Sequence, residues 1–455
     1  MSHVPAIVPK REFPWWPLSG SMPQRMREAV RRCLGARRDL SALAAAYLKV
    51  LSGTFGRLVL QTAYFLVLVG TLSLEDMGTF AAIMATGMMI GCFSSLGYAS
   101  VAYRAAAGRQ RLLGTYTAFF YAMSALTLPL ALLCALPFYA LIFAGTISLP
   151  AFLGIIVADT TCFRVIDGLH AVSNGLGRFA QGATILILFA GIRAVAALCL
   201  HLSGSHALET WAWIYFVANV AALALMLLAF RPRVRLRWHA GLFVGRFKEA
   251  ILFAFVGFTS DVQREIDKLV LITMADERAA GLYAIASRVI ELATVPIKTF
   301  YILYSRRLIA VRSHDRIVAR NLRVEFAVGA ASFAVYAAFL VASARFPTIL
   351  GANIAAARPL YTAMLFVPVF KNMMDLHAEL YFAYRRMGSR ALMLLGLIVL
   401  KVGALAALVR IDPDPLFWGA GLNAVLGGLY AVSALTVYTV ISQPAHRAGA
   451  LAASA

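Results

Sequence analysis

A run of charged side chains between residues 261 and 268 has the spacing of a single helix face. At intervals of i, i+3, i+4 and i+7 it contains Asp261, Arg264, Glu265 and Lys268. In an α-helix these four side chains fall within about 100° of one another, and Asp267 lies to one side of them. Arginine binds phosphate bidentately and lysine binds it as a point charge, so the row predicts a site for an anion. The acids between the cations would weaken that binding in one state or carry a coupling proton.

Other apolar segments in both halves of the chain also carry ionisable residues. A charge in the middle of a membrane span costs about 2.5–3.5 kcal/mol, so such residues usually face an aqueous cavity. The predicted substrate-binding cations are Arg57, Arg264, Lys268, Arg288, Lys298, Lys371 and Lys401. The predicted coupling or gating acids are Asp159, Asp167, Asp261, Glu265, Asp267, Glu291 and Asp375. Arg164 lies beside the acids of the first half, and Arg193 is alone in its apolar segment.

A purely structural interpretation competes with this one. Asp261 with Arg264, Glu265 with Lys268, and Lys371 with Asp375 have the spacing of pairs within one helix. Such pairs lower the cost of inserting each partner into lipid, and long side chains near span ends reach back to the interface. A hydrated cavity between two lobes accounts for the whole set in both halves, whereas pairing accounts for single residues.

The elements that position these residues are helices in a membrane. The chain of 455 residues is 61% hydrophobic and 14% charged, with a mean hydropathy of +0.78, which excludes a soluble enzyme. Its apolar runs are continuous and do not alternate as barrel strands do, so the spans are helical. Twelve are expected, near 51–72, 79–102, 113–137, 150–172, 180–202, 208–230, 249–274, 280–303, 325–344, 356–383, 391–410 and 416–440.

The net charge of +21 is explained by orientation in the membrane. With the N-terminus inside, cytoplasmic segments hold 29 of the 42 basic residues, outer loops hold four, and nine lie within spans. Because basic loops stay cytoplasmic, this asymmetry places both termini in the cytoplasm. The charge predicts attraction to anionic lipids of the inner leaflet and needs no nucleic-acid partner.

The spans divide into two lobes of six. We expect an N-terminal tail at 1–43, lobes at 44–230 and 249–441, a basic linker at 231–248 and a C-terminal tail at 442–455. The first tail is either an amphipathic helix on the membrane or a solvated basic segment. A weak repeat, MGTFAA from Met77 and AGLYAI from Ala280, aligns the lobes in parallel around a central cationic cavity. No spacing indicates a bound metal or cofactor.

Two segments carry a resemblance to a known family. LSGTFGRLVLQTAYFLVLVGTLSLEDMGTFAAIMATGMMIGCFSSLG, from Leu51 to Gly97, resembles the first two spans of the polysaccharide transporter, or lipid-linked oligosaccharide flippase, family. DKLVLITMADERAAGLYAIASRVI, from Asp267 to Ile290, resembles its other typical stretch. That family belongs to the multidrug/oligosaccharidyl-lipid/polysaccharide exporter superfamily.

The resemblance implies two six-helix lobes that alternate access to the two sides of the membrane. Their substrate would be a polyprenyl-diphosphate-linked oligosaccharide for O-antigen, capsule or exopolysaccharide assembly, moved across a bacterial inner membrane. Arg57, Asp267, Lys268 and Arg288 match positions where relatives place charged cavity residues. H+ or Na+ as coupling ion, and a polymerase with other glycan-assembly proteins as partners, are further expectations.

Two alternatives remain at this point. One is export of drugs or other small molecules by a member of the same superfamily. The other is a membrane-embedded glycan ligase or glycosyltransferase, which would need an outer loop rich in catalytic groups. The outer loops here are short, and no HExxH, catalytic GxSxG or phosphate-binding glycine loop occurs. We therefore expect no enzyme and no catalytic residue.

Overall fold

The computed structural model describes residues 55–310, 317–345, 351–384 and 386–442. Within these ranges the chain is helical and forms no strand. Seven helices are long and apolar enough to cross a membrane, or up to nine if each of two bent pairs counts as one span. The expected tail at 1–43, and the expected C-terminal tail beyond residue 442, lie outside the described residues.

The first half contains six helical segments in the expected places. They are Phe55–Thr71; α2, Leu74–Gly91, with α3, Tyr98–Gly108; α4, Leu113–Phe138; α5, Leu149–Val157, with α6, Phe163–Gly175; α7, Phe179–Leu202; and α8, Leu208–Phe230. A π-helical stretch, Ala158–Cys162, joins α5 to α6. The helix α4 continues through Pro129 and Pro137, two interruptions in its apolar sequence.

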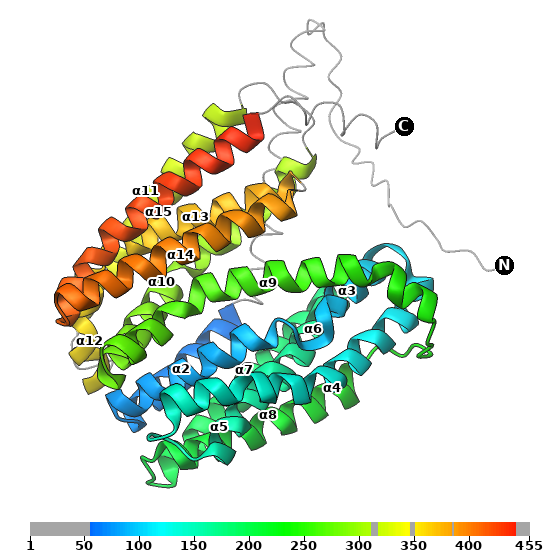
Figure 1. The fold of residues 1–455 in the computed structure, drawn as a ribbon, viewed down its shortest axis with the longest axis horizontal. Coiled ribbons are helices and arrows are strands. Elements are labelled where there is room, and N and C mark those ends of the chain that lie inside the picture. The colour runs from blue at the N-terminus through cyan, green and yellow to red at the C-terminus, as the bar shows by residue number, and fades with distance from the viewer. Residues whose placement is uncertain (1–54, 311–316, 346–350, 385, 443–455) are drawn as a thin grey trace, which may run out of the picture. The chain divides into compact units, whose positions relative to one another are not determined.

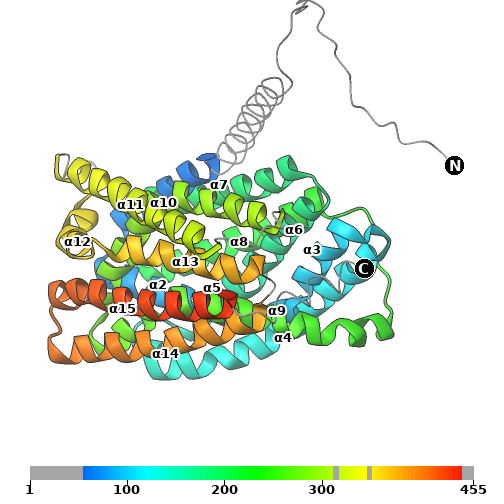
Figure 2. The ribbon, with the colours of Figure 1, turned by 90° about the horizontal axis from the view of Figure 1, so that it is seen from above.

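The second half contains the other six segments. They are α9, Ala240–Met274; α10, Glu277–Ala310; α11, Ile317–Arg345; α12, Ala352–Ala363, with α13, Val367–Ala383; α14, Met387–Ile411; and α15, Pro415–Ser442. The helices α13, α14 and α15 run side by side (Figures 1 and 2). The helix α9 begins at Ala240, inside the segment expected as a linker.

Two expected spans are broken rather than continuous. The second bends by 48° between α2 and α3, and the tenth by 71° between α12 and α13. In the first break, Ser95 and Leu96 have φ angles of 61° and 47°, and Gly97 has a φ of 78°. These left-handed conformations end one helix and start the next in a new direction, which is the usual physical origin of a sharp kink at serine and glycine.

Surface side chains of the helices agree with a lipid environment. On α4, Leu126, Leu130 and Leu133 are 67%, 58% and 61% exposed. The fully buried aromatics, which include Trp211 and Trp418, lie instead in the interior of the helical assembly. In lipid, exposed leucine costs nothing and buried polar groups need internal partners, so this distribution is that of a multi-pass membrane protein.

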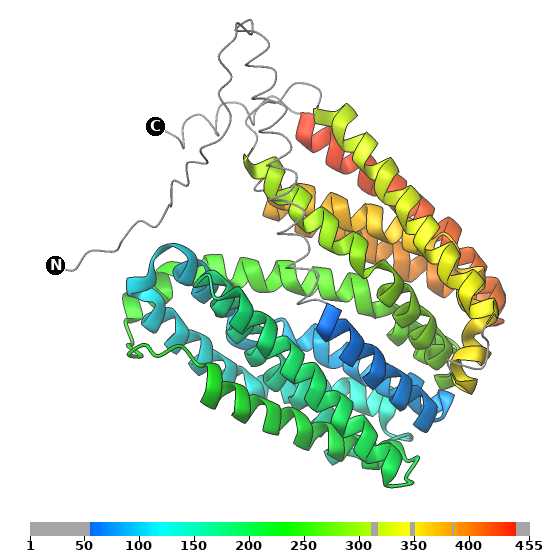
Figure 3. The same ribbon diagram turned by 180° about the vertical axis from the view of Figure 1, so that it is seen from behind.

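The helix α9 packs against both halves. Its first turns contact α3 and the break that precedes it, where Tyr98 donates a hydrogen bond of 2.8 Å to the carbonyl of Phe243. A Cβ at Gly97 would lie 1.9 Å from the carbonyl oxygen of Ala250, so only glycine permits this approach. Farther along, α9 packs on α14. Figures 1 and 3 show α9 between the helices of the first half and α13–α15 of the second.

The two halves also meet at the starts of α2 and α10, where the sequence repeat lies. A Cβ at Gly78 would be 1.9 Å from the carbonyl oxygen of Glu277, and a Cβ at Gly281 would be 2.0 Å from that of Leu74. Asn353 on α12 adds a contact between the two halves, because its side-chain amide donates to the carbonyls of Val69 and Leu72, at 2.7 and 2.9 Å. The paired glycines of the repeat therefore let α2 and α10 touch backbone to backbone.

Replacing Gly281 by alanine is expected to destabilise the protein by about 1–3 kcal/mol, because the added methyl group overpacks a backbone contact. The measurement is thermal unfolding of the detergent-purified variant. Gly403→Ala on α14 is the matched control, since nothing lies within 4 Å of its added Cβ. Alanine there should be neutral or stabilising by about 0.5–1 kcal/mol. Equal effects of the two substitutions would contradict the close contact.

Candidate functional site

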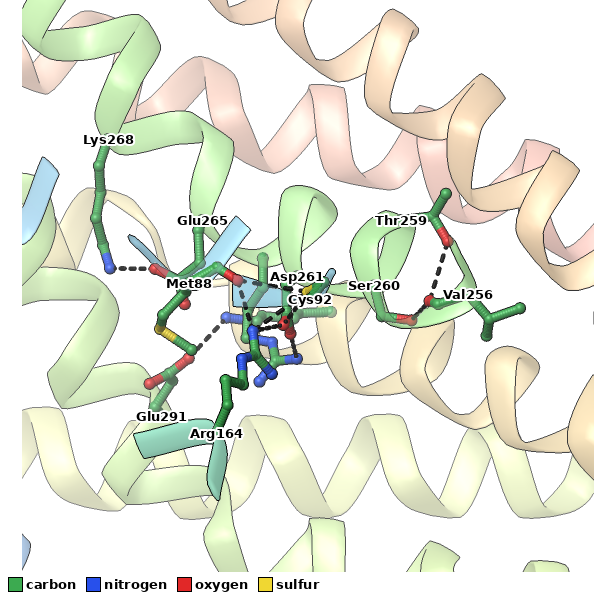
Figure 4. A network of polar contacts seen from close by, with 12 residues as sticks. Met88, Cys92, Arg164, Val256, Thr259, Ser260, Asp261, Glu265, Lys268 and Glu291 are labelled. Atoms are coloured by element: carbon green, nitrogen blue, oxygen red, sulfur yellow. Dashed lines mark hydrogen bonds and ion pairs between the residues drawn. The ribbon is translucent and has the colours of Figure 1, made fainter. Parts of the chain in front are cut away.

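Asp261 on α9 joins the two halves through polar contacts that are buried or partly buried (Figure 4). Arg164 on α6 donates to Asp261 Oδ2 at 2.7 Å, and to the carbonyl of Met88 at 2.5 Å. The thiol of Cys92, directly after α2, donates to the same carboxylate oxygen at 2.9 Å. On the other side, Arg264 donates to Asp261 Oδ1 at 2.6 Å. We call Arg164, Cys92, Asp261 and Arg264 the Asp261 junction.

Two cavities lie on either side of Arg264, which lines both. The cavity of about 270 Å³ is lined mainly by the first half together with α9 and α10, and we call it the N cavity. The cavity of about 300 Å³ is lined by α9, α10 and α13–α15, and we call it the C cavity. The Asp261 junction therefore fixes an arginine at the wall that the two cavities share.

The N cavity carries more basic than acidic side chains. Its charged lining residues are Arg57, Asp159, Arg193, Arg264, Glu265, Lys268, Arg288 and Glu291. Within this set, Lys268 pairs with Glu265 at 2.5 Å, and Arg288 pairs with Glu291 at 3.3 Å. Five basic groups against three acids leave the cavity positive, which favours an anionic occupant.

Arg193, the lone charged residue of its apolar segment, is the centre of a buried cluster. Its guanidinium lies 3.3 Å from Asp159 and donates to Asn219 at 2.9 Å. Tyr215 donates to the same Asp159 oxygen at 2.7 Å, and the ring of Phe189 stacks on the guanidinium at 4.3 Å. The second carboxylate oxygen of Asp159 has no hydrogen-bond partner among the described residues, and Asp159 lines the N cavity. This oxygen is an acceptor available to a proton or a hydrogen-bond donor.

The C cavity is built around Lys401 and Asp267. Its charged lining residues are Arg264, Asp267, Lys371, Asp375, Glu379, Arg390 and Lys401. Lys401 lies 2.8 Å from Asp267 and donates to the carbonyl of Gln263 at 2.6 Å. Tyr283 on α10 donates to the other oxygen of Asp267. Four basic groups against three acids leave this cavity slightly positive.

One ion pair connects the two cavities. Lys371, which lines the C cavity, lies 3.4 Å from Glu291, which lines the N cavity. Of the three pairs expected within single helices, the two on α9 form, at 2.6 and 2.5 Å. Lys371 also reaches across to α10 and is not confined to its own helix.

Two arginines of the cavity linings form no salt bridge with the described residues, although acids lie near them: Asp167 near Arg57, and Glu379 and Asp375 near Arg390. Within the described part of the chain, neither Arg57 in the N cavity nor Arg390 in the C cavity forms a salt bridge. The Nε of Arg390 is buried and has no hydrogen-bond partner among those residues. These two guanidiniums are therefore the groups best placed to receive an anion without first breaking an internal pair.

The expected site residues are distributed as follows. Arg57, Asp159, Arg264, Glu265, Lys268, Arg288 and Glu291 line the N cavity, and Arg264, Asp267, Lys371, Asp375 and Lys401 line the C cavity. Asp261 lines neither and holds the junction instead, while Asp167 is exposed and lines neither. The side chain of Lys298 lies outside the described residues.

Three arginines that were not among the expected site residues belong to the site. Arg164, Arg193 and Arg390 take part in the junction, the Asp159 cluster and the C cavity respectively. The position of Arg164 and Arg193 in apolar segments was a signal, because a charge there needs a partner. Arg390 lies at the start of α14, where the sequence indicated only a basic loop.

No protein-family model and no curated protein matches this sequence. The fold does match solved structures. An inward-facing multidrug resistance MATE family transporter of the MOP superfamily aligns with a TM-score of 0.62 over 84% of this chain and 94% of that chain, at 15% identity. The outward-facing form of such a transporter gives a TM-score of 0.57, over 87% and 95% of the two chains, at 15% identity.

The description of a third match concerns the polarity of its binding pocket. It is a MOP superfamily transporter from Pyrococcus furiosus for which a reversed polarity of the binding pocket suggests a different function. It aligns with a TM-score of 0.56 over 87% of this chain and 95% of that chain, at 14% identity. At these identities the matches establish a shared fold: this chain has the two-lobed helical architecture of MATE transporters.

Proposed function

We propose that this chain is a membrane transporter that works by alternating access on a substrate with an anionic group. Its fold is shared with MATE transporters described in both inward-facing and outward-facing conformations. The choice of substrate charge rests on two arginines, Arg57 and Arg390, which form no salt bridge with the described residues and line cavities with more basic than acidic groups.

The substrate we propose is a polyprenyl-diphosphate-linked oligosaccharide. A diphosphate requires several cations, and arginine suits it because its planar fork binds two oxygens at once. An inside-negative membrane potential favours outward movement of each negative charge by about 2.3 kcal/mol per 100 mV. The sequence resemblance of Leu51–Gly97 and Asp267–Ile290 to polysaccharide transporters supports the same class. The proposed location is a bacterial inner membrane, with both termini in the cytoplasm.

Export of drugs or other small molecules is the second candidate, and the structural matches support it more directly. Three of them are described as multidrug transporters, and one of these three was solved in complex with a bound compound. The positive charge of both cavities favours the anionic substrate over a cationic drug. The two candidates therefore differ in the sign of charge that the cavities accept.

Deletion of the gene in its native bacterium separates the candidates. A flippase predicts that lipid-linked repeat units accumulate on the cytoplasmic face and that surface polymer is lost, with drug susceptibility unchanged. Accumulation of finished polymer outside would indicate a ligase, and increased drug sensitivity with normal polymer would indicate a drug exporter. Either result would overturn the glycan proposal.

Complementation of that deletion tests the two arginines. Loss of one charge-assisted contact costs about 1.5–3 kcal/mol, so Arg57→Gln or Arg390→Gln should lower polymer output by roughly tenfold or more. Arg410→Gln is the matched control, because Arg410 is exposed at the end of α14 and lines neither cavity. Full complementation by both cavity variants, at normal protein level, would contradict the assignment.

A further inference from the structure

A second buried polar cluster lies in the second half, outside both cavities. His377 on α13 is 2.6 Å from Glu325 on α11, measured from Nε2 to Oε1. Two phenols of α15 also donate to this carboxylate, Tyr430 to Oε2 at 2.9 Å and Tyr438 to Oε1. The other ring nitrogen of His377 lies 2.8 Å from the hydroxyl of Ser433. Three helices thus converge on one histidine–carboxylate pair.

The pair is fully enclosed. Glu325 is 1% exposed, and both His377 and Ser433 are 0% exposed. With neutral histidine the cluster holds one net negative charge, and with protonated histidine its charges cancel. A net charge in an apolar interior is costly unless hydrogen bonds compensate for it. The three donors around Glu325 supply that compensation, so the geometry accommodates the cluster with and without the extra proton.

The hydroxyl of Ser433 allows the same cluster to satisfy both states. When His377 is neutral and donates through Nε2, its Nδ1 accepts the proton of the Ser433 hydroxyl. When His377 is protonated, Nδ1 becomes a donor to Ser433, whose own proton turns toward the sulfur of Met393, 3.4 Å away. A rotation of one hydroxyl therefore accompanies uptake or release of one proton, and no donor is left opposite another donor.

Two aromatic rings pack around His377. The ring of Tyr430 stacks on His377 at 5.5 Å, and the ring of Tyr438 meets it edge-on at 6.0 Å. Aromatic faces attract a cation through their quadrupole. Among the described residues, the titratable groups that contact Glu325 are His377 from α13 and these two phenols from α15. The helix α14 contributes Met393, whose sulfur lies 3.4 Å from the hydroxyl of Ser433.

We propose that Glu325 and His377 form a proton-binding site that couples proton movement to transport. The proposal rests on the transport function proposed above and adds a site to it. His377 shares α13 with Lys371 and Asp375, which line the C cavity. Residues 375 and 377 are two positions apart and so point to different sides of the helix. Proton binding on one side of α13 and substrate binding on the other then act on a single rigid element.

A proton fits this site better than a sodium ion. The carboxylate oxygens already accept from three donors, and Na+ would need several oxygen acceptors with vacant lone pairs, whereas a proton occupies no additional space. In the test below, a response to Na+ instead of pH therefore counts against the site.

The direct test is the protonation state of His377, observed by ¹⁵N NMR on the histidine-labelled protein in nanodiscs between pH 5 and 9. We expect one of the eight histidines to convert between a form with both ring nitrogens protonated and a neutral form, with signals that vanish in His377→Gln. In Glu325→Gln the cationic form loses its ionic partner, so its population at a given pH should fall. The other histidine signals report whether each variant is folded.

One protonation state across the whole pH range, or a change that follows Na+ instead of pH, would overturn the site. Coupling is tested with a fluorescent polyprenyl-diphosphate disaccharide in proteoliposomes. A pH gradient should accelerate its movement in the unsubstituted protein, whereas the rate in Glu325→Gln should be the same with and without the gradient. Equal acceleration in both would overturn the coupling. If His377 changes its protonation state but the protein moves no substrate, the proposed function is overturned instead.

Discussion

Asp261→Asn is expected to destabilise the protein by about 3–5 kcal/mol, because removal of one partner from a buried ion pair leaves the other charge uncompensated. Asp261 is 6% exposed and forms ion pairs with both Arg164 of the first half and Arg264 of its own helix. Asparagine keeps the shape but removes the negative charge between two guanidiniums. Thermal and denaturant unfolding of the purified protein measure the effect.

A surface pair provides the control for Asp261. Arg104 and Glu249 also join the first half to α9, but the side chain of Arg104 is 60% exposed. Exposed pairs contribute about 0–1 kcal/mol, so Glu249→Gln should be nearly neutral. Arg164→Met combined with Asp261→Asn should be less damaging than the two single effects added together, since only the partly exposed Arg264 is then left facing a neutral partner. A single variant as stable as the unsubstituted protein would refute the junction.

Lys401→Met is expected to produce the second large loss, again about 3–5 kcal/mol. Lys401 is 5% exposed and Asp267 is 3% exposed, so the lysine is the cation that compensates a buried carboxylate. After the substitution Asp267 keeps only the phenol of Tyr283 among its described partners. Methionine preserves the length of the side chain, which limits the cavity that is created. Stability and the yield of monodisperse protein are the measurements.

A double variant that also changes Asp267, the partner of Lys401, distinguishes a charge effect from a packing effect. In Lys401→Met combined with Asp267→Asn both charges are gone, so part of the stability should return. A double variant that is worse than either single change would mean that Lys401 acts through its packing. Arg410→Met on the same helix, at an exposed position, should have no measurable effect.

The helical fold was predictable because continuous apolar runs leave no other structure in lipid. Of the twelve expected spans, the described residues contain seven, or up to nine with the two bent pairs, that are long and apolar enough to cross a membrane. The spans expected at 113–137 and 208–230 agree closely with α4 and α8. The breaks in the second and tenth spans were not predicted, since their sequences are apolar on both sides of the bend. The serine pair before Gly97 was the available signal, because kinks occur at such residues.

The sequence predicted pairs within one helix but not pairs between helices. Spacing along one helix predicted the pairs of Asp261 with Arg264 and of Glu265 with Lys268. Arg193 meets Asp159, and Lys371 meets Glu291, only because separate helices pack together. Single residues such as Glu325 and His377 give no periodic signal, so their contact required the tertiary structure.

The most direct test of the account is the movement of a fluorescent polyprenyl-diphosphate disaccharide across proteoliposome membranes, measured beside a cationic dye of similar size. We predict that the protein moves the diphosphate and not the dye, and that Arg57→Gln combined with Arg390→Gln abolishes this movement while Arg410→Gln preserves it. Transport of the dye alone, or diphosphate movement that survives loss of both arginines, would contradict the anionic substrate pathway.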